Sequence, residues 1–205
     1  MNPQNFDYLY RKKEKVDVGV SRNVKKVVFL IFALFLILYP NLSPFEANHT
    51  TQYAGLGYIF NLYFFIVNQT LGIVHESGHG VCYLLDCPQF ITALNGTVFQ
   101  VGFPLLVAYY YGKKEKKMAM YIALFFVGFS LQYVAWYMST AQLSLIVPAS
   151  KSFLGVDGYH DFHYIFNAMG ILSQSLLISE VTKFFAYIMM IFSVFKMFLA
   201  SFEKE

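Results

Sequence analysis

Long apolar runs separated by short charged blocks dominate the pattern of this chain. Uncharged stretches cover 47–74, 87–112 and 118–150, while the charges gather in blocks such as Arg22–Lys26 and Lys113–Lys117. A lipid bilayer imposes such a pattern, because a charge is costly at its centre. The long runs have the length of helices and not of strands. The pattern therefore predicts an all-α bundle of membrane helices.

The order of apolar runs and of the polar, proline and glycine residues between them predicts the secondary-structure elements. In sequence they are a polar basic tail over 1–26, a first helix over Lys25–Tyr39 ended by Pro40, a polar loop over Asn41–Gln52, an apolar stretch over Tyr53–Asp86 ended by Pro88, a loop or short hairpin over Phe90–Gln100, a helix over Val101–Gly112, a span over Met118–Gln142, a loop containing Pro148, a helix over His160–Ser179, and a last span over Phe184–Phe198. These elements give five or six membrane segments.

The stretch Tyr53–Asp86 is too long for one crossing of a bilayer. A straight helix of this length would extend on the order of 50 Å, whereas the hydrocarbon core is roughly 30 Å thick. We therefore expect a break near Asn68–Gly72. The expected products are one span near 53–67 and a second helix near 70–86.

Composition supports a membrane location and excludes a nucleic-acid binder. Hydrophobic residues make up 57% of the 205 residues and charged residues only 13%, against roughly 25% charged in soluble domains. The net charge of +3 comes from basic residues that flank apolar runs, which is how membrane topology is set. Residues 1–26 are expected to be a cytoplasmic tail and 27–205 a single membrane-embedded domain. The lysines of the 113–117 loop place it on the cytoplasmic side, and the side of the C-terminus stays open.

The candidate chemistry lies in His75-Glu76-Ser77-Gly78-His79. Positions i and i+4 share one helix face, so two imidazoles can reach one ion. Zinc binds imidazole nitrogen at about 2.0–2.1 Å. Glu76 stands about 100° around the helix from His75, beside the ion, where a carboxylate can take a proton from a zinc-bound water. The motif predicts two zinc ligands, His75 and His79, and one general base, Glu76.

One helix cannot complete this site. Cys82 and Asp86 lie seven residues beyond the two histidines, roughly 10 Å along the axis, which is too far for a shared ion. The other dense group of metal-capable side chains is His160-Asp161-Phe162-His163. Asp161 would complete a His₂Asp site, whereas His160 or His163 would give a His₃ site with Asp161 orienting it. The sequence leaves this choice open, with Asp161 preferred.

Three segments together resemble the site-2 protease class of intramembrane zinc metalloproteases, in particular a small bacterial branch. His75-Glu76-Ser77-Gly78-His79-Gly80 is similar to the HExGH helix of that class. Asn95–Gln100 followed by Pro104 is similar to a Gly/Ser-rich segment of the branch, and His160–His163 to its His-Asp-Trp-His motif, with phenylalanine at 162. The Leu-Asp-Gly motif of well-studied members is absent from the sequence, as is a PDZ-like insert.

The resemblance implies a zinc-dependent peptidase in a bacterial inner membrane, with a membrane protein or peptide as its substrate. Glu76 would activate water, and Asp161 or His160 would take the role of the downstream aspartate. Gln100, Asn95 and Gln132 are polar groups in apolar stretches that either stabilise an oxyanion or, as we favour, form hydrogen bonds between helices. Two alternatives stay open: a zinc-dependent hydrolase of lipid amides or esters, and a metal-binding membrane scaffold or transporter subunit without catalytic activity.

Overall fold

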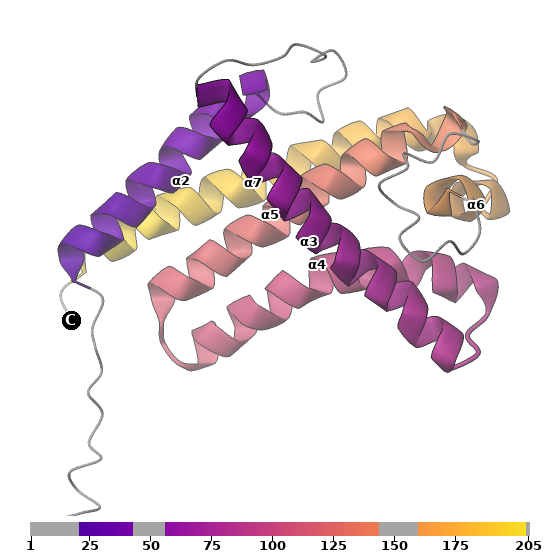
Figure 1. Ribbon diagram of the computed structural model, residues 1–205, viewed down its shortest axis with the longest axis horizontal. Coiled ribbons are helices and arrows are strands. Elements are labelled where there is room, and N and C mark those ends of the chain that lie inside the picture. The colour runs from indigo at the N-terminus through magenta and orange to yellow at the C-terminus, as the bar shows by residue number, and fades with distance from the viewer. Residues whose placement is uncertain (1–20, 43–55, 144–159, 204–205) are drawn as a thin grey trace, which may run out of the picture.

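Helices account for nearly all of the chain that this computed structural model describes, which is residues 21–42, 56–143 and 160–203 (Figure 1). Their bounds are α2 Arg22–Leu42, α3 Leu56–Leu84, α4 Gln89–Lys113, α5 Lys117–Ser139, the 3₁₀ turn η1 Ala141–Leu143, α6 Asp161–Ala168, the 3₁₀ turn η3 Leu172–Gln174 and α7 Ser175–Phe202. The described ranges contain no strand, which confirms the all-α prediction. Most of the predicted basic tail, the loop over 41–52 and the loop around Pro148 lie outside these ranges.

Three helical segments are long and apolar enough to cross a membrane, namely Gln89–Lys113, Lys117–Ser139 and Leu172–Phe202. This number, which covers only the described residues, is lower than the five or six segments predicted. Exposed apolar side chains follow the outer face of α7 from Leu176 to Phe202. Such a face is typical of a helix in contact with lipid.

The centre of the molecule is the antiparallel pair α5 and α7 (Figure 1). Gly128 lets the two helices approach closely, since a Cβ there would lie 2.7 Å from Cγ of Met190 and 2.9 Å from the carbonyl oxygen of Ala186. Farther along the pair, Ser179 Oγ donates to the Ala135 carbonyl at 2.7 Å. On the other sides α2 packs against α7, α4 against α5, and α3 against α4.

Two apolar clusters fill the interior. Phe125, Phe129 and Met190 form the centre of the first, and phenylalanines of α2 pack against it. The second lies beneath α6 and includes Tyr137 and Phe162. The first cluster fastens α2 to the α5–α7 pair, and the second positions α6 at the opposite end.

The predicted break near Asn68–Gly72 is wrong, because α3 is one unbroken helix of 29 residues. Thr70 Oγ1 donates to the carbonyl of Ile66 at 3.3 Å, so a polar side chain in this region is accommodated by the helix itself. A helix of this length extends roughly 44 Å and exceeds a bilayer core. Figure 1 shows α3 crossing obliquely over the other helices.

The predicted loop over Phe90–Gln100 is also wrong, because α4 is a continuous helix from Gln89 to Lys113. Its buried residues recur every four positions, at Thr92, Gly96, Gln100, Pro104 and Ala108. The polar residues therefore form one inward face of a helix. In a helix whose other faces are apolar, polarity marks the side turned to the protein interior.

The predicted helix over His160–Ser179 is two helices. The first, α6, ends at Ala168, and Gly170 follows with φ +70, a left-handed conformation that favours glycine. After the η3 turn, α7 continues without interruption past Glu180 and Lys183 to Phe202. The first helix and the span over Met118–Gln142 were predicted correctly, although α2 continues past Pro40 to Leu42.

Candidate metal centre

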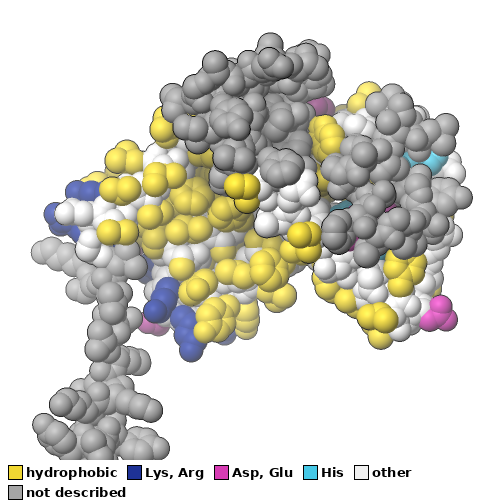
Figure 2. All heavy atoms as spheres, viewed as in Figure 1, with side chains coloured by type: hydrophobic (Ala, Val, Ile, Leu, Met, Phe, Trp, Pro, Cys, Tyr) yellow, Lys and Arg dark blue, Asp and Glu magenta, His cyan; other side chains and the backbone are white. Residues whose placement is uncertain are grey.

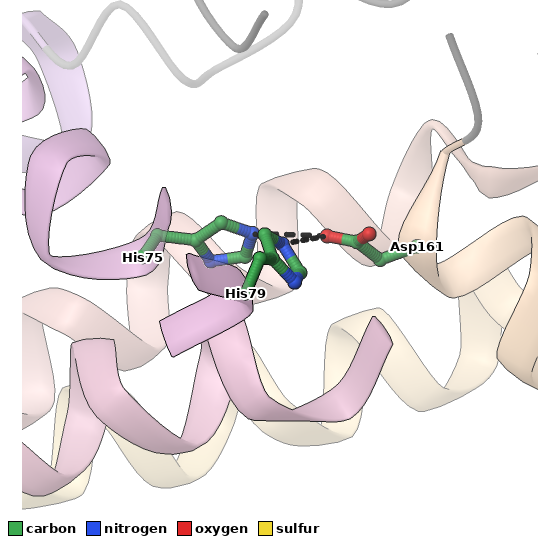
Figure 3. Close-up of side chains that lie close together, drawn as sticks. All are labelled: His75, His79 and Asp161. Atoms are coloured by element: carbon green, nitrogen blue, oxygen red, sulfur yellow. Dashed lines mark hydrogen bonds and ion pairs between the residues drawn. The ribbon is translucent and has the colours of Figure 1, made fainter. Parts of the chain in front are cut away.

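Three side chains from two helices converge on one point (Figure 3). His75 and His79 lie one turn apart on α3, and Asp161 is the first residue of α6. Asp161 Oδ2 lies 2.9 Å from His75 Nε2 and 3.3 Å from His79 Nε2, and the two Nε2 atoms are 3.1 Å apart. In a tetrahedral zinc site, ligand atoms about 2.0–2.2 Å from the ion lie roughly 3.3–3.5 Å from one another. The three atoms are close to this spacing.

The opposite ring nitrogens decide which tautomer each histidine adopts. His79 Nδ1 lies 2.7 Å from the Thr92 carbonyl oxygen, which can only accept, so Nδ1 carries the proton. His75 Nδ1 lies 3.1 Å from Gln100 Oε1, also an acceptor. In the neutral imidazoles both Nε2 atoms then present lone pairs. Two lone pairs and a carboxylate oxygen within 3.3 Å repel one another unless a proton or a metal cation lies between them.

The group is largely shielded from solvent. The side chain of His75 is 2% exposed, that of His79 12% and that of Asp161 15%. Burial by itself would raise the pKa of the Asp161 carboxyl, but when the Nε2 atoms carry protons the hydrogen bonds from His75 and His79 outweigh burial and hold this pKa below its ordinary value. Asp161 is therefore ionised near neutral pH, as a metal ligand must be.

Two glycines make this arrangement possible. A Cβ on Gly96 would lie 2.7 Å from His75 Nε2 and 2.6 Å from His79 Nε2, so only glycine fits against the metal-facing nitrogens. A Cβ on Gly78 would lie 2.4 Å from the Asn95 carbonyl oxygen. Asn95 Nδ2 in turn donates to the Gly78 carbonyl at 2.6 Å. Small residues and one amide thus bring α3 and α4 into close contact.

His160 does not belong to the convergent group. Its Nδ1 accepts the backbone N–H of His163 and so caps α6, and its Nε2 lies 2.9 Å from Thr140 Oγ1. His163 Nδ1 donates to the Ala141 carbonyl at 2.9 Å. Of the three candidates for the third ligand, the structure brings Asp161 to the histidines and uses the other two to anchor α6.

Tyr137 links the two histidine groups. Its Oη accepts the backbone N–H of Asp161 at 3.2 Å, and its ring stacks on that of His160 with centroids 4.1 Å apart. The Tyr137 ring also lies 6.1 Å from that of His75. Sequence reasoning missed this residue, since one tyrosine among the 16 of the chain gives no signal of its own.

Glu76 lies beside the convergent group on α3 and is partly exposed. It directly follows His75 on α3, so its side chain is offset by about 100° around the helix from that of His75. This is the position expected for a base that assists the metal without binding it.

The three polar residues noted within apolar stretches all form hydrogen bonds between helices, which is the role we favoured over oxyanion stabilisation. Asn95 binds Gly78, Gln100 binds His75, and Gln132 Nε2 donates to the Lys183 carbonyl at 3.4 Å. Gln100 is fully buried, and its Nε2 has no hydrogen-bond partner among the described residues. Thr92, Gly96 and Gln100 are spaced by four residues, but this spacing alone does not distinguish a helix from a loop.

Comparison with known proteins finds no matching family model, no similar curated protein and no similar solved structure.

Proposed function

We propose that this chain is a zinc metallopeptidase of the HExxH type that works in a membrane and is related to site-2 proteases. The observation that carries the proposal is the convergence of His75 Nε2, His79 Nε2 and Asp161 Oδ2, with both Nδ1 atoms already bonded to acceptors. Two nitrogen ligands and one carboxylate are a protein ligand set of catalytic zinc sites, which leave the fourth position to water or substrate. The glutamate next to His75 adds the base that hydrolysis requires.

The residues divide the chemistry among them. A bound zinc ion would supply a Lewis acid for the scissile carbonyl and lower the pKa of a water molecule to near 7. Glu76 accepts the proton of the attacking water and passes it to the leaving amine. Gln100 and the Thr92 carbonyl hold the two imidazoles in the tautomer that presents Nε2. Tyr137 holds the backbone of Asp161 in place.

The proposal includes the number of membrane segments and the side on which the N-terminus lies. Adding α2 to the three segments that are long and apolar enough gives four membrane segments, and α3 does not cross when the start of α2 and the α4–α5 turn lie on the same side. The lysines around α2 and the α4–α5 turn favour a cytoplasmic N-terminus in a bacterial inner membrane.

The deciding measurement is the zinc content and peptidase activity of the detergent-purified protein. We expect about one zinc ion per chain, because the described residues contain a single convergent group. His75→Ala and Asp161→Ala should lose the ion, whereas His160→Ala should keep it. Glu76→Gln should keep the ion and lose hydrolysis by about 10²–10⁴-fold.

Two outcomes would contradict the proposal. A folded wild-type protein without zinc, prepared without chelators, would remove the metal site. Unchanged activity in Glu76→Gln would leave a metal-binding scaffold, since a scaffold has no use for the base.

A further inference from the structure

Most basic residues of the described helices gather at one end of the molecule. Lys117 Nζ lies 2.7 and 2.9 Å from the two carboxylate oxygens of Glu203, which joins the start of α5 to the end of α7. Lys26 Nζ lies 5.2 Å from the centroid of the Phe202 ring, which brings the start of α2 to the same place. We call this region the lysine end; it comprises Lys26, Lys113, Lys114, Lys116 and Lys117. Figure 2 shows basic side chains on this side of the molecule and histidine on the other.

The candidate metal centre lies at the opposite end. Along α4, the stretch from Gly96 beside the histidines to Lys113 extends about 25 Å, at roughly 1.5 Å per residue. Along α5, the stretch from Lys117 to Tyr137 beside Asp161 extends about 30 Å. A hydrocarbon core is roughly 30 Å thick. With the lysine end at one membrane surface, the site therefore lies near the other surface and not at the bilayer centre.

Charged residues of α7 mark that second surface. Glu180 is exposed and Lys183 follows it, and from Phe184 to Phe195 the helix carries no charge. The length of α7 from Lys183 to Glu203 is about 30 Å, with Lys196 about two turns before Glu203, on the side of the lysine end. Gln132 of α5 donates to the Lys183 carbonyl, so it lies at the same level, and Tyr137 is more than one turn farther from the lysine end. The site thus lies at or beyond the edge of the apolar layer.

Positive residues flanking membrane helices stay on the cytoplasmic side. We infer that the metal centre opens at the extracytoplasmic surface of the membrane, and that its substrate is a peptide bond presented at that surface by a membrane-anchored or exported polypeptide. The peptide chemistry rests on the proposed function, whereas the side of the membrane rests on the separation between the lysine end and the site. The separation also places Glu203, and with it the end of α7, on the cytoplasmic side.

Two engineered cysteines can locate both ends in intact membranes. Cys82 and Cys87 are free and are first replaced by alanine. Gln89→Cys then places a thiol on an exposed position where α4 begins, at the site end, and Lys114→Cys places its matched control on an exposed position at the lysine end. Both variants are treated with a membrane-impermeant maleimide in right-side-out spheroplasts, before and after permeabilisation. Native Cys87 in a Cys82→Ala chain provides a second reporter at the site end.

We expect the Gln89→Cys thiol to be labelled equally before and after permeabilisation, and the Lys114→Cys thiol only afterwards. The reverse pattern would overturn the inference. Labelling of Gln89→Cys and Cys87 only after solubilisation in detergent would overturn it too, because the site would then lie within the bilayer. Labelling requires neither zinc nor hydrolysis. If the Gln89→Cys thiol is labelled from outside in a chain that holds no zinc, the inference stands and the proposed function is rejected. If that thiol is labelled only after permeabilisation in an active chain, the proposed function stands and the inference is rejected.

Discussion

The metal end and the lysine end hold their helices together by different kinds of contact. At the metal end, α3, α4 and α6 meet through directed hydrogen bonds, such as those from His75 to Gln100 and from His79 to the Thr92 carbonyl. Toward the lysine end, α2 packs on α5 through aromatic edges, with the Phe32 and Phe125 ring centroids 4.7 Å apart. The first kind of contact depends on particular atoms, and the second on apolar volume.

This difference predicts how each end responds to substitution. Directed contacts between buried polar groups fail when one partner is lost, because the other stays buried and unpaired. Apolar packing accepts exchanges that conserve volume. Small chemical changes near the site should therefore alter metal binding strongly. Comparable changes in the first apolar cluster, around Phe125, Phe129 and Met190 and called the aromatic cluster below, should alter stability slightly and metal binding not at all.

The largest effect is expected for Gly96→Ala, which adds one methyl group against the Nε2 atoms of both histidines. Zinc content should fall to the background of the His75→Ala variant. The matched control is Gly102→Ala on the same helix, where a Cβ meets nothing within 4 Å and zinc should be retained. Alanine favours a helix over glycine by up to about 1 kcal/mol, so a loss in Gly96→Ala cannot come from helix propensity. Normal zinc binding by Gly96→Ala would show that α4 does not press against the histidines.

An intermediate effect is expected for Gln100→Leu, which leaves His75 Nδ1 without its acceptor. Loss of such a partner typically weakens metal affinity by about 10–100-fold, which competition with a chromogenic chelator can measure. Gln132→Leu removes another buried amide, which binds α7 instead, and it should leave the affinity unchanged. Gln100→Glu retains an acceptor and should preserve binding. Equal losses in Gln100→Leu and Gln132→Leu would mean that general destabilisation, and not orientation of His75, is responsible.

The smallest effect is expected for Met190→Leu in the aromatic cluster. Met190 is fully buried, and the exchange nearly conserves volume, so unfolding in detergent should become easier by less than about 1.5 kcal/mol. Zinc content should not change. A loss of zinc in this variant would show that the two ends are coupled and would remove the distinction between them.

Local patterns predicted the helices that are continuous apolar runs in the sequence. The apolar runs of α2 and α5 and the spacing of His75 and His79 depend on the chain alone, and the structure agrees with them. The helical state of Phe90–Gln100 could not be recognised in this way. Its polar residues read as a loop until their contacts with α3 are known, because the same polarity serves an inward helix face.

The identity of the third residue of the convergent group could not be predicted from local sequence either. Asp161 and His160 are adjacent, and nothing local separates them. The fold selects Asp161 through contacts at the start of α6. There His160 caps the helix and stacks on Tyr137, while Asp161 turns toward α3. These contacts join residues far apart in sequence, so they require the folded chain. Gly170 likewise ends α6 through a left-handed conformation that the apolar pattern alone did not reveal.

The two histidines are supported by different parts of the chain, which has a consequence for how the sequence can drift. His75 is held by a side chain, so position 100 should stay restricted to residues that accept from Nδ1, such as glutamine or glutamate. His79 is held by a main-chain carbonyl, which every residue possesses. Position 92 could then pass through many small residues without losing the bond. Homologues of this chain should therefore show a restricted choice of residues at position 100. They should show no such restriction at position 92, because the helix backbone supplies the carbonyl there.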